Sequence, residues 1–85
     1  MDYKIEDWAN FWQFFDALTN SLLECDKRYI ASDIKSAQRY FNGFTDGLHD
    51  FIDAFFLTID KYQDEFTIEQ LSIITRLRQH LCKFL

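Results

Sequence analysis

The feature that most constrains the fold of this chain is a pair of stripes on opposite sides of one predicted helix, residues 34–62. Apolar residues recur there at steps of three and four, which places them on a single helix face. They are Ile34, Ala37, Phe41, Phe44, Leu48, Phe51, Phe55, Ile59 and Tyr62. A second set keeps the same rhythm two positions away, about 200° around the helix axis. This second set, which we call the acidic stripe, consists of Asp46, Asp50, Asp53, Asp60 and Asp64, and Leu57 occupies the one position without an acid.

The distribution of turn-forming residues indicates an all-α fold. The chain has no proline, and its two glycines are Gly43 and Gly47. A β-rich chain of this length needs turn residues at regular intervals, and this sequence lacks them. We therefore predict that residues 1–85 form a single helical domain, an antiparallel three-helix bundle with two long helices and a shorter C-terminal helix.

The predicted helix boundaries follow from capping signals. The first helix is expected to open near Lys4, with Asp2 as its N-cap, and to run to about residue 30. Ser32 or Asp33 then begins the second helix. Thr67 and Gln70 form a T-x-x-Q capping box, which predicts a third helix from Ile68 to about residue 83.

An alternative boundary lies at Asn42-Gly43, where the second helix could be broken. Asn-Gly can end a helix and Thr45 could cap another, which would give four helices instead of three. The apolar rhythm passes through this stretch without losing phase, so we favour one continuous helix. In the three-helix arrangement Cys25 and Cys82 come to the same end of the bundle. We expect both to be buried free thiols, and a disulfide between them under oxidation is the alternative.

The charge balance restricts the classes of partner. The formal net charge is −5, and an acidic chain is poorly suited to direct nucleic-acid binding, which needs a basic surface to neutralise phosphates. The same charge suits a basic protein partner. The sequence carries neither a signal-peptide pattern nor an apolar stretch of transmembrane length, so we expect a cytoplasmic protein that does not enter a membrane.

No catalytic, metal or cofactor motif stands out. Asp46-x-x-His49-Asp50-x-x-Asp53 places four potential metal ligands close together. Di-metal bundle sites, however, need two acid-x-x-His pairs plus further carboxylates facing the interior. His80 lacks an acid three residues before it and is expected to interact with the end of its helix. We therefore predict no metal, no cofactor and no enzymatic activity.

The acidic stripe is the best candidate for a functional surface. Like charges at this spacing repel one another, and Asp is a poorer helix former than Glu, so the pattern is unfavourable for the helix itself. The predicted partner-binding residues are Asp46, Asp50, Asp53, Asp60 and Asp64, with Phe56 as an aromatic anchor on the flank. They suggest a non-enzymatic interaction module, an inhibitor or immunity-type protein that docks on a basic partner such as a nuclease.

The alternative is a structural or regulatory homo-oligomer. Because a short third helix would leave the aromatic faces of the long helices uncovered, we also expect a homodimer.

Overall fold

The structure, a computed structural model, describes residues 7–41 and 45–84, and the side chains of residues 45 and 46 are not among those described. The described residues form four helices and no strand. The helices are α1 (Trp8–Glu24), α2 (Arg28–Gln38), α3 (Thr45–Lys61) and α4 (Ile68–Cys82). The predicted all-α class is confirmed.

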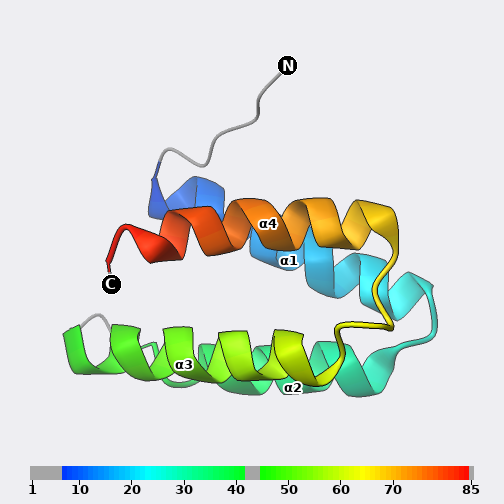
Figure 1. The fold of residues 1–85 in the computed structure, drawn as a ribbon, viewed down its shortest axis with the longest axis horizontal. Helices are drawn as coiled ribbons and strands as arrows, with labels where there is room; N and C mark the ends of the chain where they lie inside the picture. The colour runs from blue at the N-terminus through cyan, green and yellow to red at the C-terminus, as the bar shows by residue number, and fades with distance from the viewer. Residues whose placement is uncertain (1–6, 42–44, 85) are drawn as a thin grey trace.

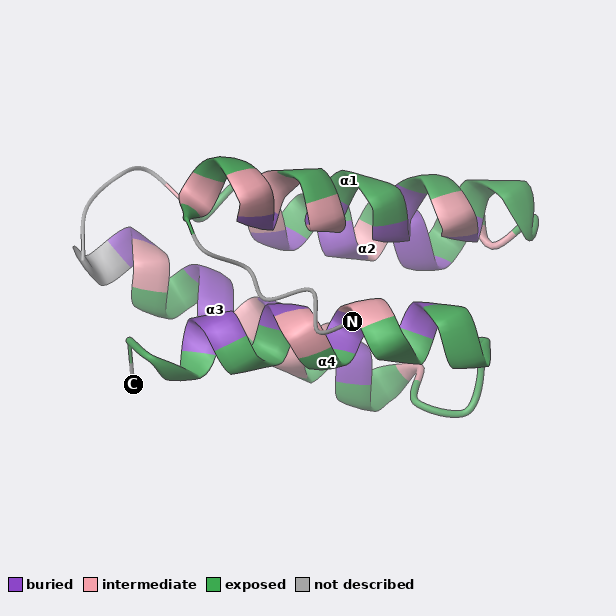
Figure 2. Cartoon of the chain, turned by 90° about the horizontal axis from the view of Figure 1, so that it is seen from above, coloured by how far each residue is buried: buried purple, intermediate pink, exposed green. Residues whose placement is uncertain are grey.

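The four helices pack as a bundle in which each helix runs antiparallel to the next (Figure 1). In that view α1 and α4 form one half of the molecule, and α2 and α3 form the other. The view from above places α1 beside α2 and α3 beside α4 (Figure 2), so α1 and α3 are diagonal. Buried positions lie mainly on the sides of the helices that face one another (Figure 2). None of the described helices has the length and apolar character needed to cross a bilayer.

The favoured continuous helix over residues 34–62 is wrong, and the four-helix alternative agrees with the structure. Helix α2 ends at Gln38 and α3 begins at Thr45, on either side of Asn42-Gly43. Asn and Gly have low helix propensity, which favours a break. The apolar positions on the two sides are spaced by nearly whole helical turns, so the periodicity is the same for one helix as for two.

The end of the first helix also differs from the prediction. Helix α1 stops at Glu24, six residues before the expected end, and Ile30 lies on α2, where it is fully buried. The chain reverses through Asp26, which has a φ of 61°, a conformation that Asp tolerates better than most residues. At the other end, Asp7 caps α1 by accepting a 2.7 Å hydrogen bond from the backbone N–H of Asn10. The expected start at Lys4 and N-cap at Asp2 lie outside the described residues.

The capping box at the start of α4 is confirmed. The Thr67 hydroxyl accepts a hydrogen bond from the backbone N–H of Gln70, at 3.1 Å, and the Gln70 side chain accepts one from the backbone N–H of Thr67, at 2.9 Å. The Gln70 amide also donates to Ser21 Oγ at 3.1 Å. The cap therefore fixes the start of α4 and joins it to the second half of α1.

The core is built on aromatic rings from the two diagonal helices. Phe11 and Phe15 on α1 and Phe51 and Phe55 on α3 are fully buried. Ring centroids of Phe15 lie 6.0 Å from Phe51 and 5.9 Å from Phe55. Helices α2 and α4 add aliphatic side chains, of which Ile30, Ile34, Leu77 and Leu81 are fully buried. Four helices thus cover the aromatic faces that a three-helix bundle would have left open, and that reason to expect a homodimer no longer holds.

The predicted burial and proximity of the two cysteines are wrong. Cys25 and Cys82 are both exposed free thiols. Cys25 follows α1 and lies near the start of α4, where the Gln70 amide contacts its sulfur at 3.6 Å, whereas Cys82 ends α4. The fourth helix reverses the direction of the last segment and so places the two thiols at opposite ends of the bundle (Figure 1).

Candidate functional site

The acidic stripe occupies the outer face of α3. Asp50, Asp53 and Asp60 are exposed, whereas Phe51 and Phe55 on the opposite face are fully buried. The predicted separation of acidic and apolar faces is confirmed for these residues. Asp64 is exposed as well, but it lies in the turn after α3 instead of on the helix. Asp46 lies within α3, and its side chain is outside the described part of the chain.

Leu57 interrupts the acidic stripe with an apolar side chain that is 72% exposed. It lies between Asp53 and Asp60 on the outer face of α3, where no neighbouring helix of the bundle covers it. The stripe is therefore a surface with carboxylates at both ends and an apolar side chain between them.

Phe56, the predicted aromatic anchor, is half-buried. Its ring packs against the core, and the guanidinium carbon of Arg78 on α4 lies 5.0 Å from the ring centroid. Such a cation–π contact contributes roughly 0.5–1 kcal/mol at a partly exposed site. Phe56 thus links α3 to α4 and offers only part of its ring to a partner.

A polar cluster fixes the C-terminal end of α3 against α2. The Tyr62 hydroxyl donates a 2.5 Å hydrogen bond to Asp33, and Lys61 Nζ lies 3.7 Å from the same carboxylate. Tyr29 donates a 2.5 Å hydrogen bond to Glu65, and Lys27 Nζ donates to the backbone carbonyl of Glu65.

These hydrogen bonds perturb the two phenols and the lysine. Donation to Asp33 raises the pKa of Tyr62 above its ordinary value, with a smaller contribution from desolvation. Donation to Glu65 raises the pKa of Tyr29 in the same way. The pKa of Lys61 is also raised, chiefly by its hydrogen bond to Tyr62. The same hydrogen bonds hold the C-terminal end of α3, the helix that carries the acidic stripe, against α2.

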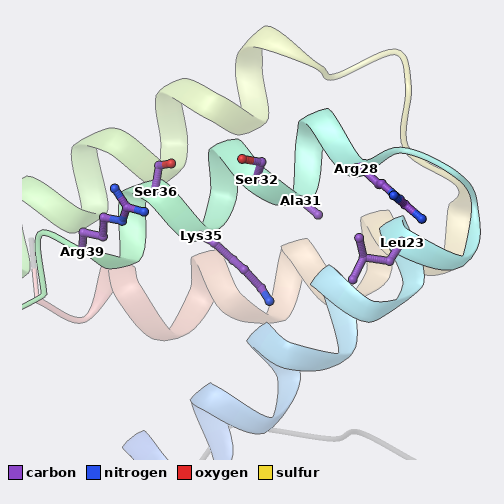
Figure 3. Close-up of a pocket in the computed structure, with 7 residues that line it drawn as sticks. All are labelled: Leu23, Arg28, Ala31, Ser32, Lys35, Ser36 and Arg39. Atoms are coloured by element: carbon purple, nitrogen blue, oxygen red, sulfur yellow. The ribbon is translucent and has the colours of Figure 1, made fainter.

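A second charged surface lies on α2 and was missed in the sequence analysis. It is a hollow of about 330 Å³, which we call the basic hollow, lined by Leu23, Arg28, Ala31, Ser32, Lys35, Ser36 and Arg39 (Figure 3). Leu23 reaches it from the end of α1 and lies near Ala31, while Lys35 extends from α2 on the side where α1 lies. The three cations are exposed, and none has an ion pair with a described residue. The sequence signal was their spacing of seven and four residues, which places them on one helix face.

Neither histidine is part of a metal site among the described residues. No group of three or more His, Cys, Asp or Glu side chains is arranged to hold a metal ion in the described part of the chain. His49 is exposed on α3. His80 is buried in an aromatic cluster near the end of α4, with ring centroids 4.8 Å from Trp8, 5.3 Å from Phe11 and 5.5 Å from Phe84.

Compared with known proteins, the chain matches no protein-family model, no curated protein and no solved structure.

Proposed function

We propose that this chain is a non-enzymatic protein–protein interaction module that binds a basic partner through the acidic stripe on α3. The observation that carries the proposal is the single sign of an exposed helix face. Asp50, Asp53 and Asp60 lie within eleven residues, and no cation lies between them on the stripe. The nearest lysine, Lys61, is paired with Asp33 on α2.

The energetics of the helix support this proposal. Like charges three or four residues apart destabilise a helix by a few tenths of a kcal/mol per pair, and Asp adds a propensity penalty relative to Glu. A solvent-exposed helix face of alternating Glu and Lys would be more stable than this one. The stability of the fold therefore does not account for the row of Asp residues. A cationic partner would remove the repulsion and use the charges for recognition.

Leu57 gives this surface the composition of a binding site. Interfaces combine an apolar centre, which excludes water, with a polar rim, which sets orientation. Here the apolar side chain lies between the carboxylates of Asp53 and Asp60. The proposed partner is a protein whose basic surface normally binds phosphates, such as a nuclease, and the chain would act as an inhibitor or immunity-type protein.

A charge-reversal experiment tests the proposal. The wild-type chain and the Asp50→Lys/Asp53→Lys variant are used to capture proteins from cells that produce the chain, and the dissociation constant of the captured protein is then measured with each. The matched control is Asp16→Lys/Glu24→Lys, which changes the net charge equally on exposed positions of α1.

We expect the stripe variant to bind at least about tenfold more weakly at low ionic strength, and the control to bind like the wild type. A stripe variant with wild-type affinity at low ionic strength would overturn the proposal. Thermal melting of all three proteins verifies that they are folded.

The homo-oligomer that would assemble through aromatic faces has less support from the fold, because Phe11, Phe15, Phe51 and Phe55 are fully buried. The large exposed apolar side chains are instead spread over several helices.

A further inference from the structure

We infer that the basic hollow receives the acidic stripe of a second copy of this chain. The inference rests on the proposed function, since it takes the stripe to be a protein-binding surface and names one basic partner for it. The chain carries two surfaces of opposite charge. The stripe lies on the outer face of α3, and the hollow lies on α2 beside the end of α1.

The spacing of the charges matches when the two helices run antiparallel. Arg28, Lys35 and Arg39 are separated by seven and four residues along α2. Read in the opposite direction along α3, Asp60, Asp53 and Asp50 are separated by seven and three. At about 1.5 Å of rise per residue, the two sets differ by about 1.5 Å over their whole length.

The apolar residues match in the same alignment. With Arg28 level with Asp60, Ala31 is level with Leu57. Ala31 and Leu23 form the apolar part of the basic hollow (Figure 3), and Leu57 is the exposed apolar residue of the stripe. The contact would therefore place an apolar side chain in an apolar depression and surround it with three pairs of opposite charge, which is the usual arrangement of an interface.

The alignment also explains the exposed cations of α2. The chain has a net charge of −5, yet three cations on one face of α2 have no ion pair with any described residue. In the aligned contact, the carboxylates of the second copy would pair with these cations. Because the contact joins two different surfaces, each copy keeps one free stripe and one free hollow. Further copies can then add unless the assembly closes into a ring.

Two complementary variants test the inference. The first, Asp53→Asn/Asp60→Asn, disables the stripe and leaves the hollow intact. The second, Arg28→Gln/Lys35→Gln, disables the hollow and leaves the stripe intact. Masses are measured by sedimentation equilibrium for each protein alone and for their equimolar mixture, at concentrations up to about 1 mM, where an association with a millimolar dissociation constant is visible. The variant Arg76→Gln/Lys83→Gln controls for loss of two cations elsewhere, on and after α4.

We expect the mass of the wild type and of the control variant to rise with concentration, and each of the two complementary variants to stay monomeric alone. The mixture should form a dimer and nothing larger, because only one native contact remains between the two variants. Neutralising two acids changes the net charge from −5 to −3, which by itself reduces repulsion between copies. Loss of association in the first variant would therefore reflect loss of the contact.

A wild type that is monomeric at about 1 mM, or a mixture of the two variants that stays monomeric, would overturn the inference. Self-association can fail while Asp50→Lys/Asp53→Lys weakens the binding of another basic protein in the capture experiment. In that case the proposed function stands without self-association. If the mixture forms the dimer while no other basic protein is captured, the second copy is the partner of the stripe.

Discussion

Neighbouring side chains of α3 belong either to the buried aromatic interior or to the exposed surface. Phe55 is fully buried and its ring contacts those of Phe15, Phe51 and Phe56. Leu57, two residues further along α3, is 72% exposed. The same helix thus carries one residue that stabilises the fold and one that we assign to binding.

This division predicts opposite consequences for two neighbouring truncations. Phe55→Ala leaves a cavity in the core and should lower the free energy of unfolding by about 3–5 kcal/mol. Leu57→Ala removes an exposed side chain and should change it by less than about 0.5 kcal/mol. Urea denaturation followed by circular dichroism measures both. Similar losses for the two variants would contradict the assignment of their roles.

The hydrogen bond from Tyr62 to Asp33 predicts a loss of stability at alkaline pH. The pKa of Tyr62 is raised in the folded chain, so the protonated phenol stabilises the fold. This contribution is complete below the unfolded value, about 10, and is lost as the pH rises through the folded pKa. Tyr62→Phe should therefore lose less stability than the wild type between neutral pH and about pH 11.

Denaturation midpoints measured across this pH range test the expectation. Tyr40→Phe, at an exposed position just after α2, is the matched control and should follow the wild type. A wild type and a Tyr62→Phe variant with equal alkaline losses would show that this hydrogen bond does not contribute.

The connections between elements determine the architecture. The start of α4 could be predicted from the sequence because Thr67 and Gln70 form a complete local cap, and such a cap depends only on neighbouring residues. The break before α3 and the end of α1 could not be predicted from the apolar period, because it continues in phase across both. In both places the spacing of the apolar residues is the same with or without the turn, so periodicity alone does not show where the chain reverses.

The turn after α1 depends on the left-handed conformation of Asp26, with φ of 61°. A β-branched residue strongly disfavours this conformation, so Asp26→Val should lower the free energy of unfolding by about 1–2 kcal/mol. Asp26→Gly, which adopts it freely, should change stability by less than about 0.5 kcal/mol. Thermal and urea unfolding of the two variants provide the comparison. Equal stability of the valine and glycine variants would mean that the turn adopts another conformation in solution.

The molecule as a whole presents two surfaces of opposite charge on a compact aromatic core. The acidic one could be predicted from the sequence, because five Asp residues in one rhythm stand out in any helical reading. The basic hollow could not be recognised in the same way, since the predicted helix boundary at Ser32 or Asp33 separated Arg28 from Lys35 and Arg39. Only when α2 begins at Arg28 do the three cations share one face.

Site-specific photo-crosslinking tests the central claim, that the outer face of α3 binds a protein, most directly. A photoreactive benzoylphenylalanine is placed at position 57, within the acidic stripe, or at exposed position 17 on α1, and adducts formed in cells that produce the chain are identified by mass spectrometry. We expect position 57 to form an adduct with a second copy of the chain or with a basic protein. This adduct should no longer form when Asp53→Asn/Asp60→Asn is introduced into the same chain. Position 17 should give no such adduct. The claim would be contradicted if position 57 formed no protein adduct, or if the adduct persisted after the two acids were neutralised.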